Sequence, residues 1–560
     1  MSDRGKEIIV INPFDGSEAF NSTKAGVSDL TFVKSMFRTN GLLVSGRTAE
    51  DEPVMLLRDL ATGEERWRIN EKTGKVIAAN EISADEMLVI AVLKIYRLNS
   101  KTGEVVWKAA TSAESEAMEG AGALGELFAA ATEQIASNVE FNLRYYPHPD
   151  KDIFVIGSES QSESRSASTD DVTIIYRNTY TAYRKSDGSM IWPEPVTMNG
   201  KFGDVAFHKN GIILLPDDGN KTRINMIDLD SGEGLWGKKG RGATIKGGVN
   251  SHIMTPDGIL LVTTSGSNTF LDLINLSDGE SLYKKPTKVS GAVVRTIPGK
   301  GGMGILTTEI FDVLEVKTGD LKLKKSIDSS PGLVDQKGSD LYVFDTKKSI
   351  LRKVNLDTAS ETEVTDDKLK FDGKDDPRNI EVRENGVLII GEQNLALIGM
   401  DGSIGFQTYY PAPRESGLNR ALLMAQGIRA AYIGANAYAA AGSIQQATPE
   451  IKEQDEISGA LVEGIGNMYS ELGDAASDFA KKSFEQAKAR FSATTQARDY
   501  IIVLSEVKKN ENALLQVSKL NGEVIGQVDL GDKREPKYAV DDVSGKIFKL
   551  VDGQILCYEL

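Results

Sequence analysis

The stretch at residues 100–107 reads SKTGEVVW and follows the apolar run IYRLN at residues 95–99. A Thr-Gly or Asp-Gly pair favours a tight hairpin turn, because glycine readily adopts the positive φ that such a turn needs. Trp107 lies four residues after the turn glycine, Gly103. One such stretch predicts a strand, a tight turn and a second strand. Its recurrence along the chain decides the fold.

The same spacing recurs along most of the chain. All four tryptophans lie four residues after a turn glycine. Later copies place Leu323 or an aromatic ring in the tryptophan position, and the copy NPFDGSEAF near the amino end places Phe20 there. The sequence NLDTASETEV at residues 355–364 keeps the pattern without a glycine. The predicted turn glycines are Gly63, Gly103, Gly188, Gly232, Gly279, Gly319, Gly402 and Gly522.

The spacing of these turns predicts the fold class. Gly188, Gly232, Gly279 and Gly319 are separated by 44, 47 and 40 residues. A period of this size with strand-like segments is typical of the four-stranded blade of a β-propeller. We therefore expect an all-β propeller, with nine or ten blades by the count of turns. The aromatic residue would lie on the outermost strand and fill the gap between adjacent blades, burying about 150–250 Å². The predicted docking residues are Trp67, Trp107, Trp192, Trp236, Tyr283 and Phe406.

The strand followed by (D/T)GxxxW resembles the repeat of the pyrroloquinoline-quinone-type β-propellers, in which tryptophan-docking motifs surround the barrel. The resemblance implies eight blades, and it covers both dehydrogenases and non-catalytic scaffolds. Dehydrogenases of that family cover their cofactor with a disulfide between adjacent cysteines. Cys557 is the single cysteine of this chain, so that ring cannot form. We therefore expect no enzymatic activity, no cofactor and no catalytic or metal-binding residues.

Two segments interrupt the repeat and divide the chain. We expect propeller blades at 1–110, a helical insertion at 111–140, further blades at 141–414, an α-helical hairpin at 415–497 and the closing blades at 498–560. Small residues recur at helical spacing in the second insertion, which favours a close helical hairpin. A second and compatible interpretation, less favoured than the plain hairpin, is that its apolar face docks on a partner, another subunit or a lipid surface. The candidate contact residues are Leu422, Leu423, Met424, Ile428, Tyr432, Ile433 and Tyr438.

Composition narrows the class of partner. The formal net charge is −16, so the chain has no generic electrostatic reason to bind nucleic acid or an anionic membrane. No apolar run is long enough to predict a transmembrane segment or a signal peptide. The chain as given is expected in the cytoplasm, or in the periplasm or cell envelope if a leader was removed. Peripheral membrane contact stays an open alternative.

The leading functional expectation is a non-catalytic scaffold for protein–protein interaction. It resembles the propeller subunits of bacterial envelope assembly machines, with 415–497 as the main contact element or as a site of self-association. The alternative is a degenerate quinoprotein-like enzyme, or a small-molecule or ion sensor, that uses the central channel of the propeller.

Overall fold

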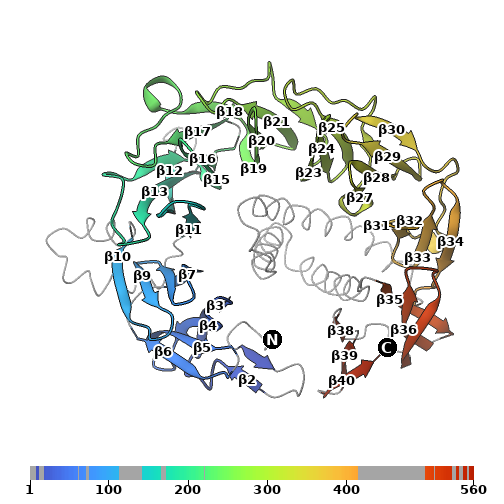
Figure 1. The fold of residues 1–560 in the computed structure, drawn as a ribbon, viewed down its shortest axis with the longest axis horizontal. Coiled ribbons are helices and arrows are strands. Elements are labelled where there is room, and N and C mark those ends of the chain that lie inside the picture. Colours follow the sequence, from blue (N-terminus) through green and yellow to red (C-terminus); the bar gives the residue numbers. More distant parts are fainter. Residues whose placement is uncertain are drawn as a thin grey trace. The chain divides into compact units, whose positions relative to one another are not determined.

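The computed structural model describes residues 8–11, 18–60, 62–70, 75–111, 142–165, 172–219, 221–413, 499–509, 511–531, 538–541, 546–551 and 554–559 (Figure 1). The chain divides into two compact units. The first contains Met1–Val249 and Leu276–Glu280, and the second contains Asn250–Asn275 and Ser281–Leu560. Both units are built from antiparallel sheets.

The first unit begins with a two-stranded sheet and continues with four four-stranded sheets. Its strands are β1 (Ile9–Ile11), β2 (Glu18–Asn21), β3 (Asp29–Met36), β4 (Gly41–Arg47), β5 (Pro53–Asp59), β6 (Glu65–Ile69), β7 (Val76–Glu81), β8 (Glu86–Ala91), β9 (Lys94–Asn99), β10 (Val105–Ala110), β11 (Asn142–Pro147), β12 (Ile153–Arg165), β13 (Val172–Arg184), β14 (Val196–Asn199), β15 (Lys201–His208), β16 (Gly211–Asp217), β17 (Lys221–Ile227) and β18 (Ala243–Lys246).

The second unit holds four four-stranded sheets and two three-stranded ones, although β19 starts at the end of the first unit. Its strands are β19 (Gly248–Thr255), β20 (Gly258–Ser265), β21 (Asn268–Ile274), β22 (Thr287–Val289), β23 (Val293–Gly299), β24 (Gly302–Thr307), β25 (Ile310–Leu314), β26 (Ile327–Asp328), β27 (Val334–Lys337), β28 (Asp340–Asp345), β29 (Ile350–Asn355), β30 (Ser360–Glu363), β31 (Asn379–Arg383), β32 (Gly386–Ile390), β33 (Asn394–Ile398), β34 (Ile404–Tyr409), β35 (Tyr500–Lys508), β36 (Glu511–Ser518), β37 (Val524–Gly531), β38 (Tyr538–Asp541), β39 (Lys546–Val551) and β40 (Gln554–Glu559).

Every four-stranded sheet is a meander, in which each strand pairs with its neighbour in sequence. This is the arrangement of a propeller blade, so the expectation of an all-β chain of four-stranded blades is confirmed. Among the described residues, eight sheets have four strands and two have three. The number of blades, eight by the resemblance or nine or ten by the count of turns, stays a prediction.

The described residues contain no α-helix. They contain three short 3₁₀ turns, η2 (Lys238–Gly240), η3 (Pro331–Leu333) and η4 (Asp372–Lys374). The expected helical insertion at 111–140, beyond Thr111, and the expected helical hairpin at 415–497 lie outside the described residues.

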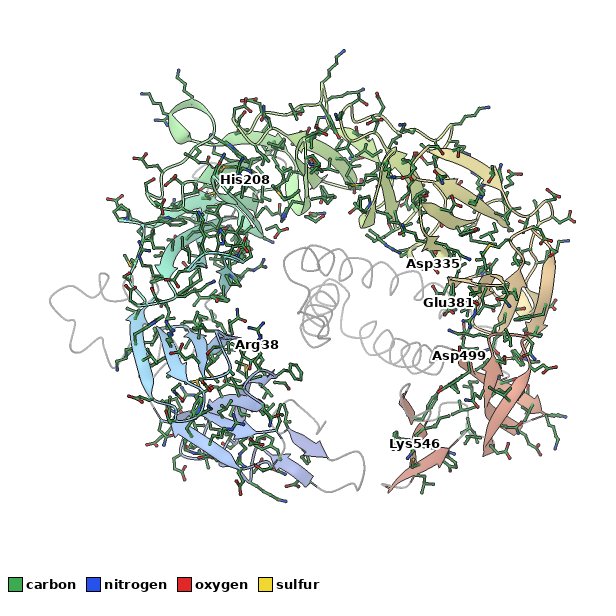
Figure 2. All side chains as sticks on the ribbon, viewed as in Figure 1. Arg38, His208, Asp335, Glu381, Asp499 and Lys546 are labelled. Atoms are coloured by element: carbon green, nitrogen blue, oxygen red, sulfur yellow. The ribbon has the colours of Figure 1, made fainter. Side chains whose placement is uncertain are left out.

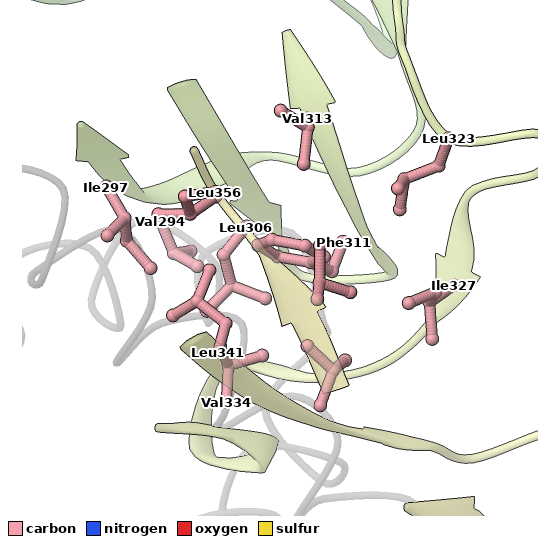
Figure 3. Packing of buried hydrophobic residues seen from close by; sticks show 12 residues of the cluster. Val294, Ile297, Leu306, Phe311, Val313, Leu323, Ile327, Val334, Leu341 and Leu356 are labelled. Atoms are coloured by element: carbon pink, nitrogen blue, oxygen red, sulfur yellow. The ribbon is translucent and has the colours of Figure 1, made fainter. Parts of the chain in front are cut away.

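The second and third strands of a blade are its buried strands, and long side chains project from the loops and outer strands (Figure 2). β24 and β32 are buried at every position, whereas β10 and β34 are exposed or half-buried throughout. Adjacent blades pack face to face through these inner strands. In the second unit, Phe311 and Val313 on β25 share one apolar cluster with Leu341 on β28 (Figure 3).

The docking residues join one blade to the turn of the next. The Trp67 Nε1–H donates to the Ser100 carbonyl at 3.0 Å, and the Trp67 ring lies against Gly103. A Cβ atom on Gly103 would lie 2.8 Å from Trp67 Cβ and Cγ. Three indole bonds of the same kind follow: Trp107 to Lys185 at 3.1 Å, Trp192 to Leu229 at 3.0 Å and Trp236 to Leu276 at 3.0 Å.

The accepting carbonyl always lies three residues before a turn glycine. In the second unit, the Tyr283 hydroxyl donates in the same way to Val316 at 2.6 Å, and its ring lies against Gly319. Phe406 has no polar group, and its ring lies against Gly522. The eight predicted turn glycines all have positive φ, between 70° and 85°.

The expected position of the tryptophans on the outermost strand is right for two of them and wrong for two. Trp67 and Trp107 lie on β6 and β10, but Trp192 and Trp236 precede the fourth strand. A buried polar side chain on the third strand explains the difference for Trp236. The Trp236 backbone N–H donates to Asn225 Oδ1 at 3.1 Å in place of a strand carbonyl.

Related arrangements occur in the next two sheets. The Tyr283 N–H donates to the Ser281 hydroxyl oxygen at 3.2 Å, and this hydroxyl donates to Asp272 at 2.6 Å. Asp312 accepts the Leu323 N–H directly at 3.3 Å. Asn225, Asp272 and Asp312 all lie eleven residues before a docking residue. The corresponding residues of the strand-borne Trp67 and Trp107 are Leu56 and Tyr96, which carry neither a carboxylate nor an amide group.

The turn at residues 355–364, which lacks a glycine, has an alanine at the glycine position. Ala359 takes the turn position with a φ of 53° and packs in the cluster that contains Leu323, the docking residue of the preceding sheet. Leucine is smaller than an indole, so we expect the space beside Leu323 to accommodate the methyl group of Ala359. On this interpretation a ring at the docking position requires glycine at the turn, and a leucine allows alanine.

This match predicts opposite effects for two exchanges. Gly103→Ala should destabilise the protein by about 2–4 kcal/mol, because the methyl group meets Trp67 and the residue keeps a left-handed φ. Ala359→Gly should stabilise it by about 0.5–1 kcal/mol, because relief of the left-handed alanine exceeds the entropy that glycine adds to the unfolded chain. Urea unfolding measures both, and equal signs would contradict the match.

Asp272 predicts a pH dependence of stability. Burial, opposed by the bonds from Ser281 and from the Leu273 N–H, raises the pKa of Asp272 to about 6. The folded state therefore holds this proton more tightly than the unfolded state, and stability falls as the pH rises from about 4 to about 6. Asp272→Asn should unfold at a higher urea concentration than the native chain at pH 7.5, with a smaller difference at pH 4.5. A difference that does not change with pH would contradict the assignment.

Candidate functional site

Two of the three histidines accept hydrogen bonds from the backbone of turns, and the third lies on a strand. His148 Nδ1 accepts the N–H groups of Asp150 and Lys151 at 3.1 and 3.0 Å. His208, which is labelled in Figure 2, accepts the N–H of Asn210 at its Nδ1 at 3.3 Å. Burial lowers the pKa of both His148 and His208. His252 lies on β19. Both imidazole acceptors therefore stabilise local backbone.

Three carboxylates gather along β27, β31 and the start of β35 in the second unit (Figure 2). Asp335 accepts the Val382 N–H at 2.6 Å, and Glu381 pairs with the nearly buried Lys519 at 2.5 Å. Asp499 lies 3.7 Å from Arg383. A buried pair of this kind ties sheets together, and each carboxylate here is used by a neighbouring sheet or strand. Within the described ranges, no three His, Cys, Asp or Glu side chains are close enough together to hold a metal ion.

Cys557, the single cysteine, is exposed near the end of β40. The candidate contact residues between Leu422 and Tyr438 lie outside the described residues. No helix in the described part of the chain is long and apolar enough to cross a membrane.

The first unit contains a groove of about 710 Å³. One side is β14, all four residues of which line the groove. The other side is the exposed face of β17 and β18 with the turns beside them. The lining residues are Val196, Thr197, Met198, Asn199, Asp218, Lys221, Arg223, Asn225, Ile227, Gly232, Gly234, Gly240, Arg241 and Thr244. We call it the cationic groove.

Two of the positive charges of the cationic groove lie on alternate, exposed residues of β17. On β17, Lys221 and Arg223 are exposed while Thr222 and Ile224 are fully buried. In the register with β18, Lys221 stands opposite Lys246 and Arg223 stands opposite Thr244. Two like charges directly across a strand pair cost free energy, so the fold alone does not favour this arrangement.

A long connection adds the third cation. From the docking residue to the fourth strand, the chain advances four residues in two other sheets, Trp192 to Val196 and Tyr283 to Thr287. Here it advances seven, from Trp236 to Ala243, through Gly-Lys-Lys-Gly-Arg-Gly. The Asn225 amide holds the insertion by donating to the Gly240 carbonyl at 2.8 Å.

The side chains of Lys221, Arg223 and Arg241 make no hydrogen bond or ion pair with the described part of the protein. Asp218 is the carboxylate among the lining residues, and burial together with the neighbouring Asp217 raises its pKa. The groove therefore carries an excess of positive charge on a chain whose net charge is −16.

Sequence reasoning missed this groove. Its signals were the alternation Lys-Thr-Arg-Ile at residues 221–224 and the basic insertion after Trp236. Neither forms a known motif, because the groove exists only once β14 of one sheet stands beside β17 of the next.

The chain matches no protein-family model and no curated protein. Among solved structures it is similar to BamB from Moraxella catarrhalis, at 12% identity over 71% of this chain and 89% of that chain, with a TM-score of 0.24. It is similar to Sqt1 from Saccharomyces cerevisiae at 11% identity over 68% and 96% of the two chains, with a TM-score of 0.30. A computationally designed protein, Ika8, is 10% identical over 68% and 96%, with a TM-score of 0.29. TM-scores this low establish neither a family nor a function.

Proposed function

We propose that the chain is a non-catalytic β-propeller scaffold that binds other proteins, as a subunit of a larger bacterial envelope-associated assembly. The observation that carries the proposal is the exposure of apolar side chains on edge strands. Val106 on β10 is 50% exposed, Ile404 on β34 is 58% exposed and Ile525 on β37 is 57% exposed.

Each of these strands is the last of its sheet, and among the described residues no strand pairs with its outer row of backbone donors and acceptors. An exposed edge with apolar side chains is a template for pairing with another chain, and soluble proteins usually protect such edges. Edge strands that stay apolar are used for recognition in strand-addition complexes. A partner protein would bury both the apolar side chains and the backbone edge.

The segment 415–497 is the proposed principal contact element. Pro411, which precedes the segment, contacts β35 in the second unit, since the Glu506 N–H donates to the Pro411 carbonyl at 2.8 Å and the Ser505 hydroxyl donates to it at 3.0 Å. Asp499 precedes Glu506 by seven residues, roughly 23 Å along a strand, so a Gly-Ser linker of about 12 residues is long enough to replace the segment.

A charge on an edge strand should weaken partner capture. Ile525→Asp in the full chain is expected to reduce the amount of cross-linked partner recovered from the native organism at least tenfold, because the carboxylate must be desolvated in the interface. Thr318→Asp, which adds the same charge at an exposed turn of the second unit and not on an edge strand, is the control and should retain the partner. Quantitative mass spectrometry measures both, and equal recovery from the two variants would contradict an edge-strand interface.

Replacement of 415–497 by a short Gly-Ser linker should leave the thermal unfolding of the blades intact while partner capture or self-association is lost. Light scattering reports the oligomeric state, and cross-linking reports the partner. Retention of both the partner and the native oligomeric state would show that this segment is not the contact element.

A further inference from the structure

The free edge of β14 borders the cationic groove. β14 is the last strand of its sheet and pairs on one side with β13, with Asn199 opposite Arg177 and Thr197 opposite Thr179. Within the described residues, no strand pairs with its other edge. The edge therefore offers main-chain hydrogen bonds to a ligand that enters the groove.

The cations of the groove follow the period of a strand. Lys221 and Arg223 are two residues apart on β17, so their side chains leave the same face about 6.6–7 Å apart. An extended peptide presents alternate side chains at that same interval. Acidic residues at alternate positions of such a peptide can therefore meet Lys221 and Arg223 in turn, with Arg241 on the adjoining connection.

The glycine-rich connection is poorly suited to a phosphate. A phosphate cradle needs several backbone N–H groups aimed at one point. Here the N–H groups of Gly240, Arg241 and Gly242 donate to the carbonyls of Gly237, Lys238 and Trp236. The cations are also spread along a strand instead of converging, which favours an elongated ligand.

We propose that the cationic groove binds an extended acidic segment of a partner protein, which adds to the free edge of β14 as a fifth strand. The inference rests on the proposed scaffold function and names the chemistry of one partner segment. Main-chain bonds to β14 supply the pairing, and contacts with Lys221, Arg223 and Arg241 select alternating carboxylates.

The test uses the full chain and a fluorescein-labelled peptide, GSVEVEVDSG, in a fluorescence anisotropy titration at low salt. The double variant Arg223→Glu/Arg241→Glu should raise the Kd at least tenfold. Lys284→Glu/Lys285→Glu, which makes the same change of charge at two exposed lysines of the second unit, should leave the Kd within twofold. Equal affinity of the native chain and the groove variant would overturn the proposal.

Two further peptides separate strand addition from general charge attraction. A peptide with Lys at the acidic positions should not bind, and one with Pro at the central Val should bind at least tenfold more weakly, because proline cannot donate to a ladder. Hydrogen exchange should slow at β14 and not at β22 when GSVEVEVDSG binds. Unchanged exchange at β14, full binding of the proline peptide, or displacement by 1 mM inorganic phosphate would each refute the added strand.

The outcome is distinguishable from failure of the proposed function. If no peptide binds while Ile525→Asp still abolishes capture of a partner, the groove assignment is wrong and the scaffold function stands. If the peptide binds as expected while the full chain retains no partner protein, the groove assignment stands and the assembly role is wrong.

Discussion

The contact between a docking residue and the turn of the next sheet is the constraint on which the arrangement of blades depends. Each indole occupies the space above a turn glycine and uses its single polar atom to reach the carbonyl three residues before that glycine. The ring thus excludes water from the gap without leaving a buried N–H unpaired. The same contact thus links the docking residue of one sheet to the turn of the next in each of these pairs.

This contact also limits the size of the residue at the turn. The turn residue must lack a Cβ where the docking residue is a ring, and it can carry a methyl group where the docking residue is Leu323. Ala359 has a left-handed φ that alanine adopts only at a cost, which shows that the backbone of the turn is kept even when its preferred residue is not. The left-handed backbone of the turn is therefore kept at the position where the preceding sheet packs, whichever residue occupies it.

The blade architecture could be predicted from sequence because it depends on a local and repeated signal. The pattern of Gly103 followed four residues later by Trp107 can be recognised without reference to distant residues. The departure of Trp236 from the outermost strand could not be predicted in this way, since it depends on Asn225, eleven residues earlier and on another strand. The groove was harder still, because Lys221 and Arg223 read as the exposed face of an ordinary strand until β14 is placed beside them.

The same reasoning explains where function can reside on such a chain. A docking residue and its turn are tied to each other, so neither can change without its partner, and they leave little freedom for recognition. The connection after the docking residue has no such tie. Between Trp236 and Ala243 it accommodates extra residues because Asn225 and the Trp236 carbonyl anchor its two ends. Charge can be placed there, and on the exposed alternate residues of β17, without altering the contact that holds the sheets together. Recognition is thus built on the parts of the blade that docking leaves free.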